Sequence, residues 1–174
     1  ISETVAALKK TPSFVYLYVN DLDSAGHSDG VGSEKWLAAL NGIDVMVSKL
    51  LTELPQGVRL WITADHGMIN VGEKVVMGLD NNLLDSIETI AGEPRMRHLY
   101  LAQGHNLEMR NEVIARWQES LGAKVTMHTR ESAISAGLFG GEVSLDASER
   151  IGDVIAIAQG DLVLLDPERA DKEG

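Results

Sequence analysis

The run Ser-Phe-Val-Tyr-Leu-Tyr-Val-Asn at residues 13–20 is rich in β-branched and aromatic side chains and predicts a buried strand. A polar loop at residues 20–32 follows it. Residues 34–54 then place apolar side chains every three or four positions, and those expected to be buried are Trp36, Leu40, Ile43, Val47 and Leu50. This spacing predicts an amphipathic helix, which Ser33 would cap. The run Arg-Leu-Trp-Ile-Thr at residues 59–63 predicts a second strand. The order strand, helix, strand predicts a βαβ unit with two parallel strands and a right-handed crossover.

The rest of the chain continues this alternation of strands and helices. We expect strands over residues 74–77, 97–102 and 124–128, and helices over residues 82–90, 107–121, 129–136 and 144–150. Two further apolar runs, at residues 154–158 and 162–165, predict a hairpin because a short polar turn joins them. Together these elements predict an α/β fold.

The composition narrows the class of protein. The 174 residues include 15 basic and 26 acidic side chains, which gives a formal net charge of −11. Because nucleic-acid binding needs clustered Lys and Arg, this charge argues against a nucleic-acid polymer as partner, while a metal can still hold a small phosphorylated substrate. Hydrophobic residues make up 44% of the chain, which excludes wholesale disorder. No apolar run reaches the roughly 20 residues that span a bilayer, and the absence of cysteine excludes disulfides and thiolate metal ligands.

Two short polar clusters directly follow the two strands of the predicted βαβ unit. Asp23 and His27 lie four residues apart after the first strand, and Asp65 and His66 are adjacent after the second. Carboxylate and imidazole groups suit zinc, manganese or a similar divalent ion. Because ligands bind beyond the carboxyl ends of parallel strands, we expect the two clusters to meet at one sheet edge as a two-metal site.

Each cluster alone has a simpler interpretation, since polar loops after strands are usually turns. Asp21 is an alternative to Asp23, but the spacing to His27 favours Asp23. Thr63 is interpreted as a strand residue rather than a support for the second pair, and Asp29 as a solvated loop residue. The remaining histidines are interpreted as structural or solvated: His98, His105 and His128. No serine occupies a nucleophile elbow, and neither a Walker A loop nor a dinucleotide fingerprint occurs.

The two clusters lie in the stretches Asp-Leu-Asp-Ser-Ala-Gly-His-Ser-Asp-Gly, at residues 21–30, and Thr-Ala-Asp-His-Gly-Met, at residues 63–68. Both stretches resemble motifs of the nucleotide pyrophosphatase/type I phosphodiesterase family, within the alkaline phosphatase superfamily. Softer similarity extends to residues 92–95 and 150–154. The resemblance implies an alkaline-phosphatase-like α/β sandwich with a mainly parallel central sheet flanked by helices. Residues 1–174 would then form the C-terminal portion of a single catalytic domain of that kind.

The resemblance also implies a reaction and its cofactors. Enzymes of this family are metal-dependent phosphodiesterases, usually with zinc, and they form a covalent phospho-enzyme on a Thr or Ser. Asp23 and His27 would bind one metal ion and Asp65 and His66 the other, with manganese as the alternative to zinc. The family's nucleophile, a further Asp and a further His have no convincing match in this sequence, so we expect a fragment without activity of its own.

The resemblance leaves the substrate and the exact reaction open. We expect a small phosphorylated substrate, such as a nucleotide or a phosphodiester. The alternatives are a phosphomonoesterase, a phosphonate hydrolase or a sulfatase-like hydrolase on the same scaffold, and a metal-binding domain without catalysis. The segment that carries the nucleophilic Thr or Ser would distinguish these enzyme activities from one another, and it has no convincing match in this sequence. The sequence also leaves the oligomeric state and the compartment open.

Overall fold

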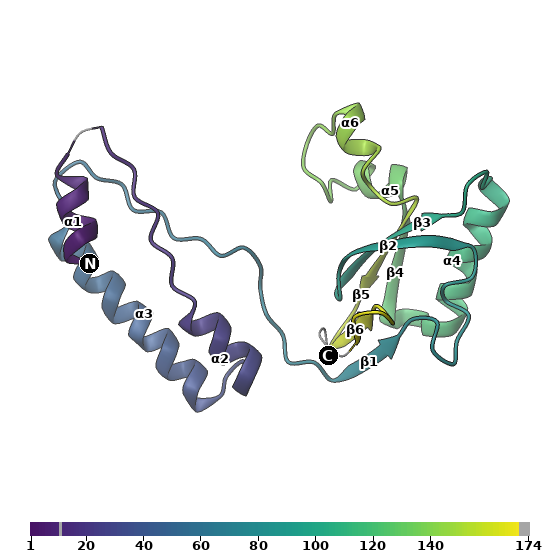
Figure 1. The fold of residues 1–174 in the computed structure, drawn as a ribbon, viewed down its shortest axis with the longest axis horizontal. Helices are drawn as coiled ribbons and strands as arrows, with labels where there is room; N and C mark the ends of the chain where they lie inside the picture. Colours follow the sequence, from purple (N-terminus) through teal and green to yellow (C-terminus); the bar gives the residue numbers. More distant parts are fainter. Residues whose placement is uncertain (11, 171–174) are drawn as a thin grey trace. The chain divides into compact units, whose positions relative to one another are not determined.

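Two units make up the chain in the computed structural model, Ile1–Asn70 and Val71–Gly174, and the structure describes residues 1–10 and 12–170. Figure 1 colours the first unit purple to blue and the second teal to yellow. The described residues of the first unit form helices α1 (Ser2–Leu8), α2 (Asp21–Asp29) and α3 (Glu34–Glu53). None of the helices among the described residues is long and apolar enough to cross a membrane.

Helix α3 confirms the helix predicted over residues 34–54. The Ser33 hydroxyl accepts a hydrogen bond from the Trp36 N–H over 3.2 Å, which satisfies one of the unpaired donors at the start of the helix. Leu50 is buried, but Leu40, predicted on the same face, is 40% exposed. The other predicted core positions are half-buried: Trp36, Ile43 and Val47. The helix therefore buries its apolar face less completely than the sequence predicts.

The strands predicted at residues 13–20 and 59–63 do not form. Both runs have irregular backbone, and their aromatic side chains face solvent, with Phe14 89% and Trp61 85% exposed. Strands need a neighbour that pairs with their backbone N–H and C=O groups, and the described part of the first unit contains no strand. The predicted βαβ unit is therefore wrong apart from its helix, and the loop predicted at residues 20–32 contains helix α2.

The described residues of the second unit form two sheets, which Figure 1 shows in teal, green and yellow. The larger sheet is antiparallel, with strands in the order β2 (Ile87–Glu93), β3 (Met96–Leu101), β5 (Val154–Ala158) and β4 (Val125–Thr129). The smaller sheet is a parallel pair of β1 (Glu73–Val76) and β6 (Leu162–Leu165). The α/β class is thus confirmed, and parallel pairing among the described residues is confined to β1 and β6.

Two predictions in the second unit are wrong. Strands β5 and β6 form as predicted but do not pair as a hairpin, because β5 pairs with β3 and β4 while β6 pairs with β1. Residues 82–90 form a turn and the start of β2 instead of a helix. Ser86 has a φ of 66°, which a right-handed helix does not allow, and Ile90 lies opposite Leu99 of β3. Pairing between strands therefore outweighs a local spacing that resembles a helix.

The α-helices in the described part of the second unit confirm their predictions, and a capping side chain precedes each of them. They are α4 (Leu107–Leu121), α5 (Arg130–Ser135) and α6 (Leu145–Ser148), capped by Asn106, Thr129 and Ser144. The 3₁₀ helix η1 (Gly122–Lys124) follows α4. Trp117 of α4 is fully buried in one core cluster with residues of both sheets, among them Leu99 and Leu164. This cluster joins α4 and the two sheets into one hydrophobic core.

Candidate metal site

Helix α2 carries the first predicted pair of metal ligands. Asp23 and His27 are four residues apart, so the helix places both side chains on one face. The Nε2 atom of His27 lies 3.5 Å from Oδ1 of Asp23, with the His27 side chain 70% and the Asp23 side chain 47% exposed. The two groups are therefore neighbours at the surface, placed by a helix rather than by the predicted loop after a strand.

The carboxylates around this pair have separate roles. Asp21 and Asp23 both lie in the first turn of α2, where a negative charge interacts favourably with the helix dipole. Asp29, in the last turn, forms an ion pair with Lys35 over 2.6 Å. Hydrogen bonds from the Lys35 ammonium and from the Ser28 hydroxyl hold the pKa of Asp29 below its usual value. Asp29 is thus committed to partners of its own.

The second pair lies in the irregular segment between α3 and β1. Asp65 Oδ1 accepts a hydrogen bond from the His66 N–H over 3.1 Å, and His66 Nδ1 lies 2.8 Å from the Gly67 carbonyl oxygen. Because a carbonyl oxygen only accepts, this contact assigns the ring proton of a neutral His66 to Nδ1. The Nε2 atom, 3.8 Å from Asp65 Oδ2, then carries the lone pair. Thr63 donates its hydroxyl to the Ala64 carbonyl oxygen over 3.2 Å.

The structure forms two donor pairs and does not join them into a larger cluster. Among residues 1–10 and 12–170, no group of three or more His, Asp or Glu side chains lies close enough together to hold a metal ion. Carboxylate oxygen and imidazole nitrogen fit zinc or manganese chemically. Each pair supplies two protein ligands, whereas a catalytic zinc site usually has about three. The strand ends that would bring the pairs together are missing, so the assignment of all four residues to metal stays a prediction.

The sequence does not predict the contacts that join the segments carrying the two pairs. The Asn70 side chain accepts a hydrogen bond from the Val31 N–H over 2.8 Å and donates one to the Val31 carbonyl oxygen over 3.0 Å. Val31 follows α2, and Asn70 lies four residues after His66. No sequence signal marks this contact, because an asparagine near glycines is usually a local turn residue.

The other histidines lie in the second unit. Nδ1 of His98 accepts a hydrogen bond from the Gly152 N–H over 3.1 Å, and burial lowers the pKa of His98 below its ordinary value of 6.5. Nε2 of His105 lies 3.6 Å from Oδ1 of Asp153. Nδ1 of His128 lies 3.3 Å from the Ser132 hydroxyl. Each of these imidazoles therefore has a polar neighbour within its own unit.

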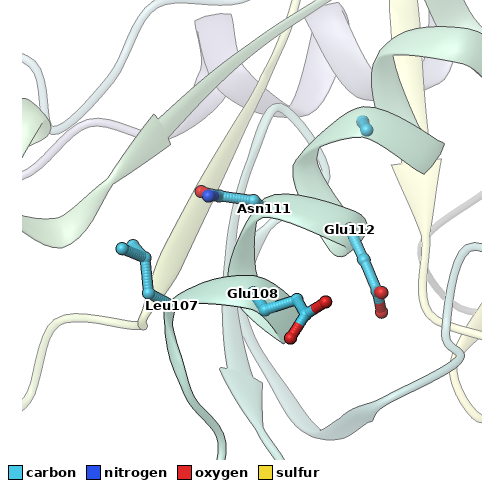
Figure 2. A pocket seen from close by; sticks show the side chains of 5 residues that line it. Leu107, Glu108, Asn111 and Glu112 are labelled. Atoms are coloured by element: carbon cyan, nitrogen blue, oxygen red, sulfur yellow. The ribbon is translucent and has the colours of Figure 1, made fainter.

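Figure 2 shows a shallow pocket on the surface of helix α4. Its lining comes from successive turns of that single helix: Leu107, Glu108, Asn111, Glu112 and Ala115. Another hollow, in the first unit, is lined mainly by small and apolar side chains between Val19 and Met46, together with Asp21. Neither pocket is lined by a residue of the two donor pairs, so neither adds a ligand to them.

Comparisons with known proteins identify the family and the fold. The family model described as type I phosphodiesterase / nucleotide pyrophosphatase matches residues 1–174. Murine ectonucleotide pyrophosphatase / phosphodiesterase 5 is similar with a TM-score of 0.68 and 15% identity, covering 99% of this chain and 44% of that one. The human protein of the same name gives a TM-score of 0.57 and 18% identity, covering 86% of this chain and 38% of that one. Comparison with curated proteins gave no match.

The structural likeness supports the alkaline-phosphatase-like fold that the sequence motifs imply. At identities this low it is evidence for the fold alone. This chain spans less than half the length of either solved structure. The family assignment rests instead on the family model, which matches from the first residue to the last. The chain therefore belongs to the type I phosphodiesterase / nucleotide pyrophosphatase family.

Proposed function

We propose that this chain is part of a metal-dependent phosphodiesterase that hydrolyses phosphodiester or phosphoanhydride bonds. The observation that carries the proposal is the match of the family model over residues 1–174. In the proposed site Asp23 and His27 bind one divalent ion, and Asp65 and His66 bind another, with zinc favoured over manganese. Two such ions, when bound, would stabilise negative charge on the phosphoryl oxygens.

The contacts of the donor residues support their role as ligands. Helix α2 holds Asp23 and His27 on one face, so both can bind the same ion. The Gly67 carbonyl oxygen orients the His66 ring and keeps its proton on Nδ1, which prepares Nε2 for a metal. All four side chains are exposed, so ligands from other segments and a substrate can reach them. We place the nucleophile and the remaining ligands outside these 174 residues.

A small phosphorylated substrate, such as a nucleotide or a phosphodiester, fits this site best. The chain carries a net charge of −11, so its overall field repels an anionic substrate. Positive charge must then come from the site itself, and two divalent ions would supply it. This argument favours a compact phosphate ester, bound at the metal ions, over a nucleic-acid polymer that needs an extended basic surface.

Two alternatives remain in view. One is another hydrolase of the same superfamily, acting on a phosphomonoester, a phosphonate or a sulfate ester. The other is a metal-binding domain without catalysis, which is in keeping with the lack of a convincing match to the family's nucleophile in this sequence. A comparison of turnover among phosphodiester, phosphomonoester and sulfate-ester substrates distinguishes the first alternative from the proposed activity. A protein that binds metal without turnover would indicate the second alternative.

The test is hydrolysis by the full-length protein. We expect turnover of bis(p-nitrophenyl) phosphate that exceeds turnover of p-nitrophenyl phosphate and of an aryl sulfate, and that disappears with a chelator. His27→Ala and Asp65→Asn should each lower kcat/KM about 100-fold or more, because loss of an outer-shell partner already costs about 10–100-fold. Asp29→Asn, a nearby carboxylate with its own partners, is the matched control and should keep activity. Turnover that survives both the chelator and the two ligand variants would refute the proposal.

A further inference from the structure

The segment that carries Asp65 and His66 has no regular structure of its own to hold it in place. Residues 54–72, between α3 and β1, contain neither helix nor strand. By contrast, the backbone hydrogen bonds of α2 fix Asp23 and His27 relative to each other. The position of the second pair relative to the first must therefore come from side-chain contacts of the irregular segment.

One such contact is the double hydrogen bond between Asn70 and Val31. The Asn70 amide pairs with both the N–H and the carbonyl oxygen of Val31, over 2.8 and 3.0 Å, as a neighbouring strand would. Gly30 adopts a φ of 87°, and a Cβ added there would lie 3.0 Å from Asn70 Oδ1. The backbone at residues 30–31 is thus shaped to receive this one side chain.

A second contact lies closer to the ligands. Gly26 is buried and directly precedes His27, and a Cβ built on Gly26 would overlap the sulfur of Met68. The same Cβ would lie 3.6 Å from Cδ1 of Trp36 on α3. Met68, two residues after His66, therefore packs its thioether against the bare backbone of α2, beside His27.

We propose that Asn70 and Met68 are positioning residues that hold the Asp65–His66 segment against α2 and so set the spacing of the two donor pairs. This inference rests on the proposed function, in which the pairs bind metal. Side chains that orient ligands without touching the metal change metal affinity because they reduce the ordering needed on binding. Asn70 bonds through its side chain to the backbone of Val31, and the Met68 side chain packs against the backbone of Gly26.

The test measures zinc affinity of the metal-free, full-length protein by competition with a chromophoric chelator. Asn70→Ala and Met68→Ala should each weaken zinc binding about tenfold or more. Asn70→Asp keeps the hydrogen-bond acceptor but loses the donor, so its zinc affinity should lie between those of the wild type and Asn70→Ala. Met68→Leu keeps the apolar contact and should bind zinc as the wild type does. The matched control is Asn81→Ala, because the Asn81 amide makes the same kind of bonds to backbone, at Gly78 and Val76 in the second unit.

A second readout works without metal. In the metal-free protein, hydrogen exchange at residues 65–67 should quicken in Asn70→Ala and Met68→Ala and stay unchanged in Asn81→Ala. Gly26→Ala displaces Met68, so it should weaken zinc binding as Met68→Ala does. In the double variant Gly26→Ala/Met68→Ala, the fold-loss of zinc affinity should be smaller than the product of the two single fold-losses, because both substitutions remove the same contact.

The outcomes separate this inference from the proposed function. If Asn70→Ala and Met68→Ala bind zinc as tightly as the wild type does, the positioning role is overturned, while the proposed metal ligands are unaffected. A loss of affinity of equal size in Asn81→Ala would show a general loss of stability and would also overturn it. A wild-type protein that binds no zinc refutes the proposed function and this inference with it.

Discussion

The indole N–H of Trp117 donates a hydrogen bond to the carbonyl oxygen of Leu83 over 2.9 Å, and both side chains are fully buried. The bond connects helix α4 to the turn before β2 within the core of the second unit. Trp117→Phe keeps most of the apolar surface but removes the donor from a buried carbonyl. We expect it to lower the free energy of unfolding by about 1–3 kcal/mol, measured by urea denaturation.

Trp61→Phe is the matched control, because Trp61 is 85% exposed. An exposed substitution of this kind should change the free energy of unfolding by less than about 0.5 kcal/mol. Equal losses in the two variants would mean that the burial of Trp117 and its hydrogen bond do not stabilise the second unit.

Leu50 and Leu51 offer a similar comparison inside helix α3. Leu50 is 3% exposed and Leu51 is 59% exposed, although they are neighbours with the same side chain. Leu50→Ala should cost about 2–5 kcal/mol, because it removes buried methyl groups and leaves a cavity. Leu51→Ala should cost less than about 0.5 kcal/mol. A larger loss for Leu51→Ala in chemical denaturation would show that α3 buries the side that carries Leu51 instead of the side that carries Leu50.

His98 predicts a pH dependence of stability. Burial holds the pKa of His98 below its ordinary value of 6.5, and its Nδ1 must be unprotonated to accept the hydrogen bond from Gly152. Below pH 6.5 the unfolded chain takes up a proton that the folded chain does not, so stability falls as the pH falls from 6.5 toward the lowered pKa. Above pH 6.5 both states are neutral at this residue and its contribution is constant.

His98→Gln keeps an acceptor that does not titrate, so it should flatten this part of the profile. The measurement is the difference in unfolding free energy between wild type and variant across that pH window. His128→Gln serves as the control, because the ring of His128 contacts Ser132 and takes no part in the bond between His98 and Gly152. A difference between wild type and His98→Gln that stays constant with pH would contradict the argument.

Local signals predicted α3 and α4 well, although they missed α1 and α2 and predicted a helix over residues 82–90 that does not form. Helix α3 has both an apolar face and the capping hydroxyl of Ser33, and each lies within a few residues of the turn that it stabilises. Helix α4 likewise begins at the Asn106 cap. Strand pairing depends on distant segments, so the sequence placed β6 correctly but joined it to β5 instead of to β1. The apolar run at residues 13–20 predicts a buried strand, yet Phe14 faces solvent because the described residues offer it no partner strand.

The chemistry of the candidate site was easier to predict than its geometry. The spacing of Asp23 and His27 brings them together on a helix as well as it would in the predicted loop. The expected convergence of all four donors required two adjacent strands, and these do not form. The bond from Asn70 to Val31 spans 39 residues, so no local pattern announces it.

Metal content of the full-length protein tests most directly whether these four residues are metal ligands. After loading with zinc and removal of free metal, elemental analysis should find about two zinc ions per wild-type chain. We expect about one ion in His27→Ala and about one in Asp65→Asn, because each variant breaks one pair, and about two in the control Asp29→Asn. Undiminished zinc in both ligand variants, or no zinc in the wild type, would contradict the assignment.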